Sequence, residues 1–269
     1  MAEPHATWKF EGDGYRNFGR CFLSTVGFGT YLGEADDETD AGYSESLKRA
    51  FELGCNVVDT AINYRHQRSE RVVGEVLDGG SVNDDEVFVS TKGGYIPFRL
   101  DVPDDPKRFI TEEYIEPGLV SPEDVVDANC INPEFLKNQI GRSLENLRRD
   151  SVDLYYVHNP ETHLKVMEPE EFESLLTDVF VMLERKVGDS IGSYGVATWD
   201  GLRAREEETK HISLESLVET AEEAAEEVGN DENSFDAVQM PYNANMTEAY
   251  TRKNQRVRGE EMSALEAAE

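Results

Sequence analysis

The feature of this sequence that most restricts its fold is an alternation of short apolar segments with longer amphipathic ones. The apolar segments predict strands at 24–30, 55–60, 86–91, 152–158, 191–198 and 235–240. The spacing of apolar residues predicts helices at 41–54, 69–78, 132–149, 168–188, 213–229 and 259–269, the second of them opened by Ser69. Apolar strands that alternate with helices indicate a parallel sheet with right-handed crossovers.

Two parallel architectures fit this alternation, a doubly wound nucleotide-binding fold and a TIM-type (β/α)8 barrel. The doubly wound fold carries a Gly-x-Gly-x-x-Gly loop after its first strand, and GFGTYLG at 27–33 does not have this spacing. An acidic loop of ten residues also precedes the first predicted helix. A barrel needs no such fingerprint and places its chemistry on loops after the strands, so we expect a barrel.

One long segment, residues 95–133, interrupts the alternation of predicted strands and helices. Six of the ten prolines lie in it, which argues against a helix, and it is longer than an ordinary strand–helix connection. Because it follows the C-terminal end of strand 86–91, we expect it on the face that carries the chemistry. The prediction is a lid or a wall of the active-site pocket, and a solvent loop without a role is the alternative.

The charge balance is strongly acidic, with 56 Asp and Glu against 26 Lys and Arg and a formal net charge of −30. This charge repels nucleic acid and anionic membranes. Only nine residues are lysine, and the acidic residues are dispersed along the chain. These features indicate a protein from the cytoplasm of an extreme halophile, where molar salt screens the repulsion. A merely acidic mesophilic protein is the alternative.

The cysteines and the N-terminus also point to the cytoplasm. Cys21, Cys55 and Cys130 have neither a pairing rhythm nor the spacing of a zinc site, which indicates a reducing compartment. Residues 1–10 have no apolar stretch with a basic flank, so we expect no signal peptide. No uninterrupted apolar stretch approaches the ~20 residues that a membrane span needs.

Reactive side chains stand where three successive predicted strands end. Asp59 closes one strand and is followed five residues later by Tyr64, while Lys92 and His158 close the next two. Each has an ordinary structural explanation when taken alone, as a turn cap, a solvated charge or a core histidine. Strand ends converge on one mouth in a barrel, however. We therefore expect the four side chains to share one cleft.

These residue types suggest proton donation to a carbonyl oxygen. A lysine ammonium beside a phenol is expected to lower the pKa of the Tyr64 hydroxyl, and Asp59 would hold that ammonium. Tyr64 then donates a proton to an oxygen that His158 orients. The sequence shows no nucleophile with its base, no phosphate loop and no metal-spaced cluster, so hydride would come from a nicotinamide cofactor.

The segments DTAINY, SERVVGEVL, VFVSTK, VDLYYVHNP, SYGVATW and FDAVQMPYN, in this order, resemble the aldo-keto reductases. The resemblance extends from about Phe18 to the C-terminus. It implies a TIM-type (β/α)8 barrel and NAD(P)H-dependent reduction of aldehydes and ketones to alcohols, with NADP(H) preferred to NAD(H) and without metal or flavin. The catalytic tetrad of the family falls on Asp59, Tyr64, Lys92 and His158.

The resemblance also implies cofactor contacts. Gln239 matches the glutamine that hydrogen-bonds the nicotinamide carboxamide, and Asp59 and Thr30 are further predicted contacts. Thr198 occupies the place of one member of a Ser-Asn pair, and Ala197 replaces the other. Alanine offers no hydrogen bond, so the carboxamide is expected to be held less firmly.

The predicted substrate pocket comprises Trp199, Asn159 and Tyr95, and simple packing under a loop is the alternative for Trp199. The expected partner is a small carbonyl compound, not nucleic acid or a membrane. The family barrel has eight strands, whereas this sequence predicts six before Glu269, which would lie within the sixth helix.

We therefore expect residues 1–269 to form a single aldo-keto reductase-like barrel domain of about six β/α units. The domain would be C-terminally truncated, without the last two barrel strands. An open barrel exposes the edges of its sheet. Two other functions thus stay open: a catalytically silent regulatory protein that binds a nicotinamide, and a non-functional truncated remnant.

Overall fold

The predicted parallel sheet is present in the computed structural model, which describes residues 14–80 and 82–269. Its six strands stand in chain order, and each pairs in parallel with the next. They are β3 (Phe28–Gly29), β4 (Val57–Asp59), β5 (Phe88–Gly93), β6 (Val152–His158), β7 (Ile191–Ala197) and β8 (Phe235–Gln239). This order is what repeated right-handed β–α units produce, so the α/β class with about six units is confirmed.

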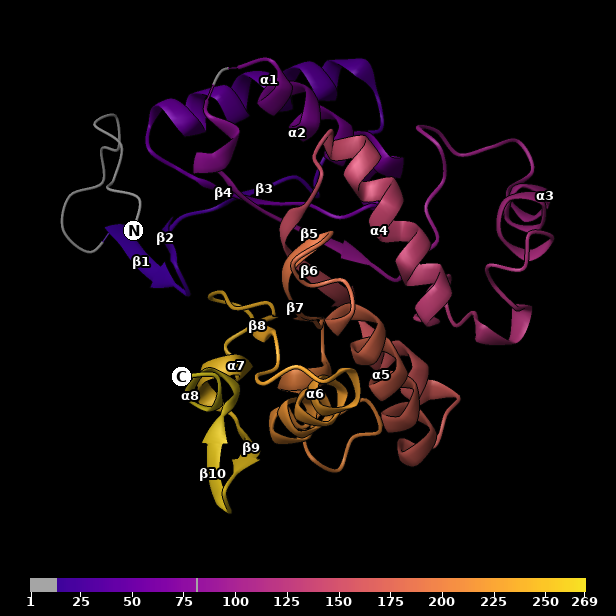
Figure 1. Cartoon of the computed structure of the whole chain (residues 1–269), viewed down its shortest axis with the longest axis vertical. Coiled ribbons are helices and arrows are strands. Elements are labelled where there is room, and N and C mark those ends of the chain that lie inside the picture. Colours follow the sequence, from indigo (N-terminus) through magenta and orange to yellow (C-terminus); the bar gives the residue numbers. More distant parts are fainter. Residues whose placement is uncertain (1–13, 81) are drawn as a thin grey trace.

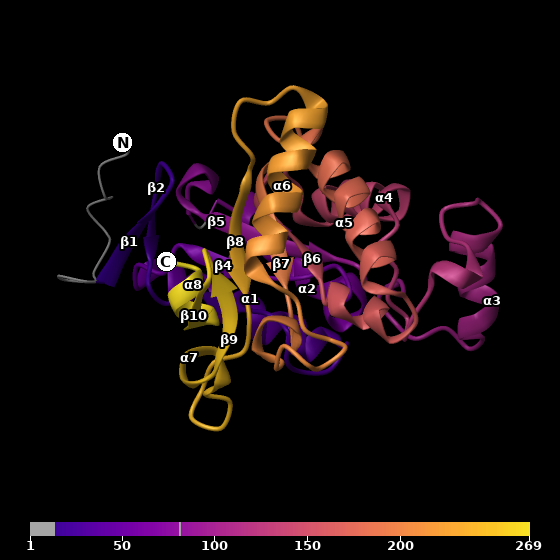
Figure 2. The ribbon, with the colours of Figure 1, turned by 90° about the horizontal axis from the view of Figure 1, so that it is seen from below.

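The long helices cover the outer face of the sheet (Figure 1). They are α1 (Asp37–Glu52), α2 (Arg68–Asp78), α4 (Pro133–Leu147), α5 (Pro169–Glu184) and α6 (Leu214–Val228). Figure 2 shows α4, α5 and α6 side by side over one part of the sheet. Among the described residues, no helix combines the length and the apolarity needed to cross a bilayer. The segment 1–10, predicted not to be a signal peptide, lies outside the described residues.

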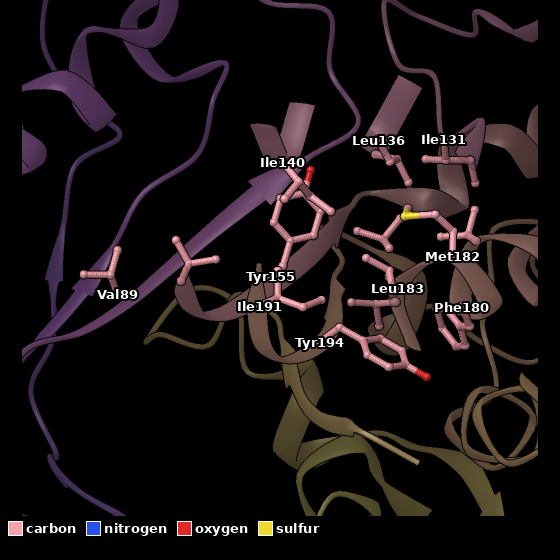
Figure 3. Packing of buried hydrophobic residues seen from close by; sticks show 14 of the residues in the cluster. Val89, Ile131, Leu136, Ile140, Tyr155, Phe180, Met182, Leu183, Ile191 and Tyr194 are labelled. Atoms are coloured by element: carbon pink, nitrogen blue, oxygen red, sulfur yellow. The ribbon is translucent and has the colours of Figure 1, made fainter. Parts of the chain in front are cut away.

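The main hydrophobic core lies between the sheet and these helices. Side chains of the strands meet those of α4 and α5 there, as Figure 3 shows, and the buried residues include Val89, Tyr155, Ile191, Tyr194, Leu136, Ile140, Phe180 and Leu183. Burial of one such side chain contributes roughly 1.5–3 kcal/mol relative to exposure. The core thus holds the strands in a fixed order and aligns their C-terminal ends.

The N-terminal boundaries differ from those predicted. A hairpin of β1 (Tyr15–Phe18) and β2 (Cys21–Ser24) precedes the sheet, so only the end of the segment 24–30 joins it. Helix α1 begins within the predicted acidic loop because the Asp36 side chain accepts a hydrogen bond from the Thr39 amide and caps the helix. Helix α2 begins before Ser69, whose hydroxyl donates to the Thr30 carbonyl at 2.7 Å and caps nothing.

The prediction of a single C-terminal helix over 259–269 is wrong. After β8, the chain forms α7 (Glu248–Thr251), a hairpin of β9 (Lys253–Val257) and β10 (Glu260–Ser263), and α8 (Ala264–Ala267). Arg258 and Gly259 both have positive φ, at 52° and 84°, which suits the tight turn of a hairpin. A capping box between Ser263 and Glu266 then starts α8.

The insertion 95–133 is not free of helix, contrary to the prediction. It contains α3 (Pro106–Ile110) and a π-helical turn over Thr111–Ile115, and proline is tolerated at the first position of a helix because its missing N–H is not needed there. Part of the segment packs in a small core of its own, formed by Ile96, Tyr114, Val120, Cys130 and Phe135. In both views α3 lies beyond α4 (Figures 1 and 2), and the role as a lid stays a prediction.

Several single turns connect these elements. They are η2 (Tyr64–Gln67), η3 (Asp84–Glu86), η5 (Pro122–Asp124), η6 (Pro160–Lys165) and η7 (Gly201–Arg203). Three of them, η2, η6 and η7, are the next elements after β4, β6 and β7. The loops after β4, β6 and β7 are therefore short, whereas β5 is followed by the long insertion 95–133.

Candidate active site

The centre of the candidate site is an ion pair between neighbouring strands. Asp59 ends β4, and Lys92 lies in β5, which pairs with β4. The Lys92 ammonium donates to both carboxylate oxygens of Asp59 at 2.8 Å and to the carbonyl of Thr60 at 2.8 Å. An ammonium has three N–H donors, so all three are used. The Lys92 side chain is 1% exposed and that of Asp59 is 26% exposed, which leaves the carboxylate facing the open side.

Two neutral donors complete the environment of this carboxylate. The Ser90 hydroxyl donates to Asp59 at 3.1 Å from β5, and the Gln239 amide donates to it at 2.9 Å from β8. Because β8 is the far edge of the sheet from β3, the bond from Gln239 shows that the sheet is strongly curved. The predicted cofactor residue thus contacts the predicted catalytic carboxylate.

Tyr64 lies over this pair. It begins the η2 turn, and the ammonium nitrogen of Lys92 is 4.9 Å from the centre of its ring. Its ring centre is 6.0 Å from that of His158 and 5.0 Å from that of Tyr31, both in edge-on arrangements. Among the described residues the Tyr64 hydroxyl has no hydrogen-bond partner, so it is available to a ligand.

The prediction that Lys92 lowers the pKa of Tyr64 is wrong. Burial raises the pKa of the Tyr64 hydroxyl well above its usual value, and the negative charge of Asp59 raises that pKa further. The ammonium has no N–H left for the phenol, because its donors bond Asp59 and Thr60. The lysine therefore neutralises the carboxylate, and the phenol stays protonated.

His158, at the end of β6, is a neutral imidazole. Burial, followed by the positive charge of Lys92, lowers the pKa of His158 to about 3. Its Nδ1 is buried and has no hydrogen-bond partner among the described residues. The Tyr95 ring stands edge-on to the imidazole with the ring centres 5.1 Å apart, so Tyr64 and Tyr95 both contact it.

Two of the predicted pocket residues, Tyr95 and Asn159, lie beside His158. The Asn159 side-chain amide donates to the Tyr95 hydroxyl at 3.0 Å, so these two contact one another. Trp199 follows β7 and is 54% exposed, which is not the burial expected of simple packing under a loop. Thr198 and Thr30 are both buried, and the Thr30 hydroxyl donates to the Thr60 hydroxyl at 2.9 Å. Contact of either threonine with a cofactor stays a prediction.

Asn129 also holds the site in place and was not predicted. It is fully buried, and its amide donates to the His158 carbonyl at 2.8 Å, while its oxygen lies 3.0 Å from Nε2 of His163. It lies near the end of the insertion 95–133, where no periodic pattern marks any one asparagine. Asn129 matters because the end of the insertion packs against the end of β6, a contact that only the tertiary structure shows.

Glu161 holds the loop after β7. Its Oε1 accepts hydrogen bonds from the backbone amides of Trp199 at 2.8 Å, Asp200 at 2.9 Å and Gly201 at 3.3 Å. No pattern in the sequence indicates these three backbone contacts. The loop that carries Trp199 is therefore anchored to the segment after β6.

The comparison with known families agrees with this arrangement. The profile of the Aldo/keto reductase family matches residues 25–245, which include all six strands of the parallel sheet. This chain belongs to the aldo/keto reductase family. In the described part of this aldo/keto reductase, no cluster of three or more His, Cys, Asp or Glu side chains is placed to hold a metal ion.

Curated relatives of this aldo/keto reductase are distant. It is 26% identical over 141 residues to prostaglandin F synthase 1 of Bos taurus, a match that covers 52% of this chain and 32% of the relative. It is 25% identical over 192 residues to the NADH-specific methylglyoxal reductase of Escherichia coli (strain K12), covering 68% and 51%. The D-threo-aldose 1-dehydrogenase of a Pseudomonas species is 30% identical over 151 residues, covering 56% and 40%. The chain thus spans about half or less of these relatives.

Solved structures support the fold of this aldo/keto reductase. The holo form of an aldo-keto reductase from Bacillus halodurans has a TM-score of 0.51 and 18% identity, and the alignment covers 85% of this chain and 57% of that one. A thermostable aldo-keto reductase solved with the inhibitor epalrestat gives 0.52 and 20%, covering 85% and 62%. With the family match, these likenesses imply that the six strands belong to a (β/α)8 barrel.

Proposed function

We propose that this protein is an NAD(P)H-dependent oxidoreductase that reduces aldehydes and ketones to alcohols, with Tyr64 as the general acid. The observation that carries the proposal is the cluster of Tyr64, Lys92, Asp59 and His158 at the ends of three neighbouring strands. Membership of the aldo/keto reductase family supports it. The activity is a proposal because the chain spans only part of its relatives.

Tyr64 would supply the proton. Its hydroxyl has no hydrogen-bond partner among the described residues and carries its proton at neutral pH. Its raised pKa keeps the proton in place until an alkoxide forms, and an alkoxide is a stronger base than a phenolate. Lys92, whose ammonium nitrogen is 4.9 Å from the centre of the Tyr64 ring, would neutralise the Asp59 charge that otherwise opposes negative charge on the phenol.

His158 would orient the carbonyl. A neutral imidazole carries one N–H group. Nδ1 of His158 is buried and has no acceptor among the described residues, so a proton there would be left without a hydrogen bond. We therefore assign the proton to Nε2. The Nε2–H group can then donate to the substrate oxygen beside the Tyr64 hydroxyl. Because the pKa of His158 is lowered to about 3, the imidazole keeps this role throughout the neutral range.

A bound nicotinamide would supply the hydride. The residues present fit such a group, because the exposed Trp199 offers an aromatic surface next to Thr198 and because the Gln239 amide faces Asp59 at the same edge of the sheet. Gln239 and Thr198 would hold the carboxamide. The preference for NADP(H) over NAD(H) stays a prediction, and one relative carries the name NADH-specific.

The experiment compares the chain with its Tyr64→Phe variant in a spectrophotometric assay at 340 nm, with NADPH or NADH, small aldehydes and molar KCl. We expect the variant to lose roughly 100-fold or more in kcat, because general acid catalysis contributes about 10²–10⁴-fold. Its thermal unfolding should match that of the parent, since the lost hydroxyl has no protein partner. Equal turnover in the two proteins would remove Tyr64 as the acid.

The same samples distinguish the alternatives. Fluorescence titration of NADPH against the parent chain measures binding without any need for turnover. Binding with no turnover would favour a silent regulatory protein of the same fold. Absence of a cooperative unfolding transition in molar KCl would favour a non-functional remnant. A cytoplasmic, halophilic origin is proposed along with the activity, from the charge of −30 and the few lysines.

A further inference from the structure

The turn that follows Tyr64 has an unusual backbone. Arg65, His66 and Gln67 have φ values of 49°, 57° and 73°, so three successive residues that are not glycine occupy the left-handed region. The Cβ atom makes this region unfavourable, and residues other than glycine usually visit it singly. Conformations of this kind persist only where the surroundings enforce them. The contacts of the turn should therefore show what enforces it.

The first support is a socket for the Arg65 side chain, which is 2% exposed. Its guanidinium donates to the carbonyls of Glu34 at 2.7 Å and Asp36 at 3.2 Å and forms a short ion pair with Asp40. It also lies over the ring of Tyr43, with 5.1 Å to the ring centre. All four partners belong to the loop after β3 and to α1, so this segment holds the start of the turn.

The second support comes from the insertion. The His66 carbonyl accepts a hydrogen bond of 2.9 Å from the Leu100 amide, and the Gln67 side chain donates one of 2.6 Å to the Phe98 carbonyl. The rings of His66 and Phe98 also pack together, with centres 5.5 Å apart. The turn is thus held from two sides by segments that are distant in sequence.

The residue that these two supports position is Tyr64. Its hydroxyl has no partner among the described residues, so its own hydrogen bonds do not fix its place. The ring lies between Lys92, His158 and Tyr31, and Tyr31 belongs to the loop that also receives Arg65. The direction of the Tyr64 backbone therefore decides where the phenol points.

We propose that the left-handed turn Arg65–Gln67 is a positioning element that aims the Tyr64 phenol, with Arg65 as its anchor. The inference rests on the proposed function only for its effect on turnover. Its structural part concerns the place of the Tyr64 ring and can be tested without a substrate. Arg65, His66 and Gln67 are positioning residues here, since none of them contacts the reacting atoms.

Position 66 allows a matched set of variants. His66→Gly, His66→Asn and His66→Val all remove the contact with the Phe98 ring, yet they differ in their tolerance of positive φ. Glycine adopts the left-handed region freely, asparagine tolerates it, and a β-branched valine opposes it. If the backbone conformation matters, glycine and asparagine should behave alike and valine should differ. If only the ring contact matters, all three should behave alike.

The measurement is NMR of the full chain with ¹³C-labelled tyrosine rings in molar KCl, with the Tyr64 signal assigned by Tyr64→Phe. We expect His66→Gly and His66→Asn to leave the Tyr64 signal in place and His66→Val to shift or broaden it. The signals of tyrosines remote from the site, such as Tyr194 in the core, should remain unchanged. A Tyr64 signal that stays in place in His66→Val would overturn the proposal, as would equal shifts in all three variants.

A second pair of variants guards against misfolding of His66→Val. Arg65→Gln removes the buried charge while keeping two hydrogen-bond donors, and Arg49→Gln at the exposed pair with Glu52 on α1 serves as its control. We expect only Arg65→Gln to move the Tyr64 signal. An unmoved signal in Arg65→Gln would remove Arg65 as the anchor.

Turnover adds a separate readout. If Tyr64 is the acid, His66→Val should lower kcat about tenfold or more at an unchanged KM, because misplacement of a catalytic group by an ångström is costly, and His66→Asn should restore it. A shifted Tyr64 signal with unaltered turnover would contradict the proposed function and leave the positioning intact. If the Tyr64 signal stays in place in His66→Val while Tyr64→Phe loses its turnover, the positioning is contradicted and the proposed function is left intact.

Discussion

Gln239 donates a hydrogen bond of 2.9 Å to Asp59, although 180 positions separate the two residues in the sequence. One residue ends β8 and the other ends β4, and three strands of the sheet lie between them. Such a bond forms only if the sheet curves so far that side chains of distant strands meet inside it. This curvature, as in a barrel, is what gathers the strand ends into one site.

Removal of the Lys92 charge should destabilise the chain. Lys92→Met leaves the carboxylate of Asp59 without its cation, and breaking a buried ion pair in this way costs about 3–5 kcal/mol. We expect a value near the lower end, since the Asp59 side chain is 26% exposed. Urea unfolding measures the loss, and Lys165→Met, which removes an exposed pair with Asp127, is the control. Equal stability of the parent and Lys92→Met would contradict the role of the pair.

Stability should fall as the pH drops below 6.5. Burial lowers the folded-state pKa of His158 from 6.5 to about 3, so between these values the unfolded chain binds a proton that the folded chain does not. The unfolded state is then favoured by up to about 1.4 kcal/mol per pH unit for this residue. Urea unfolding from pH 7 to pH 4 measures the slope, and His158→Asn should flatten it. An unchanged slope in that variant would show that other groups cause the loss.

Two glycines in helices should respond in opposite ways to alanine. A Cβ on Gly74 in α2 would lie 2.5 Å from the Asn146 carbonyl oxygen of α4, whereas one on Gly141 in α4 would meet no atom within 4 Å. Gly74→Ala should therefore cost about 1–3 kcal/mol, as overpacking does. Gly141→Ala should gain about 0.5–1 kcal/mol from its better helix propensity. Thermal unfolding of both variants checks this, and an identical shift in the two would refute the packing argument.

Salt should stabilise this chain. Its formal net charge of −30 makes the folded state repel itself, and the Debye length falls from about 10 Å at 0.1 M salt to about 3 Å at 1 M. The melting temperature should therefore rise between 0.1 M and 2 M KCl, with most of the rise below 1 M. A melting temperature that falls with KCl over this range would show that attractive surface pairs outweigh the repulsion.

Much of the architecture follows from local patterns. Short, mostly apolar runs locate β4 to β8, because a strand buried on both faces is largely apolar. The helices appear in the spacing of their apolar residues. Asp59, Lys92 and His158 are conspicuous since each is a charged or titratable side chain at the end of such a run.

Other features escape the local pattern because distant contacts decide them. The hairpin of β9 and β10 replaces a predicted helix, since the side chains of Asn254 and Gln255 bond the backbone of the loop after β7. α3 begins at Pro106 because a proline at the first helical position costs nothing. Propensity alone predicts neither.

The sequence by itself determined that a parallel sheet forms and that a carboxylate, a phenol, an ammonium and an imidazole follow its strands. Only the tertiary structure decided how they act on one another. Lys92 gives all its N–H groups to Asp59 and Thr60, so burial raises the pKa of Tyr64 instead of the lysine lowering it. Desolvation and the direction of hydrogen bonds depend on what surrounds a side chain in space, and the order of residues along the chain does not state them.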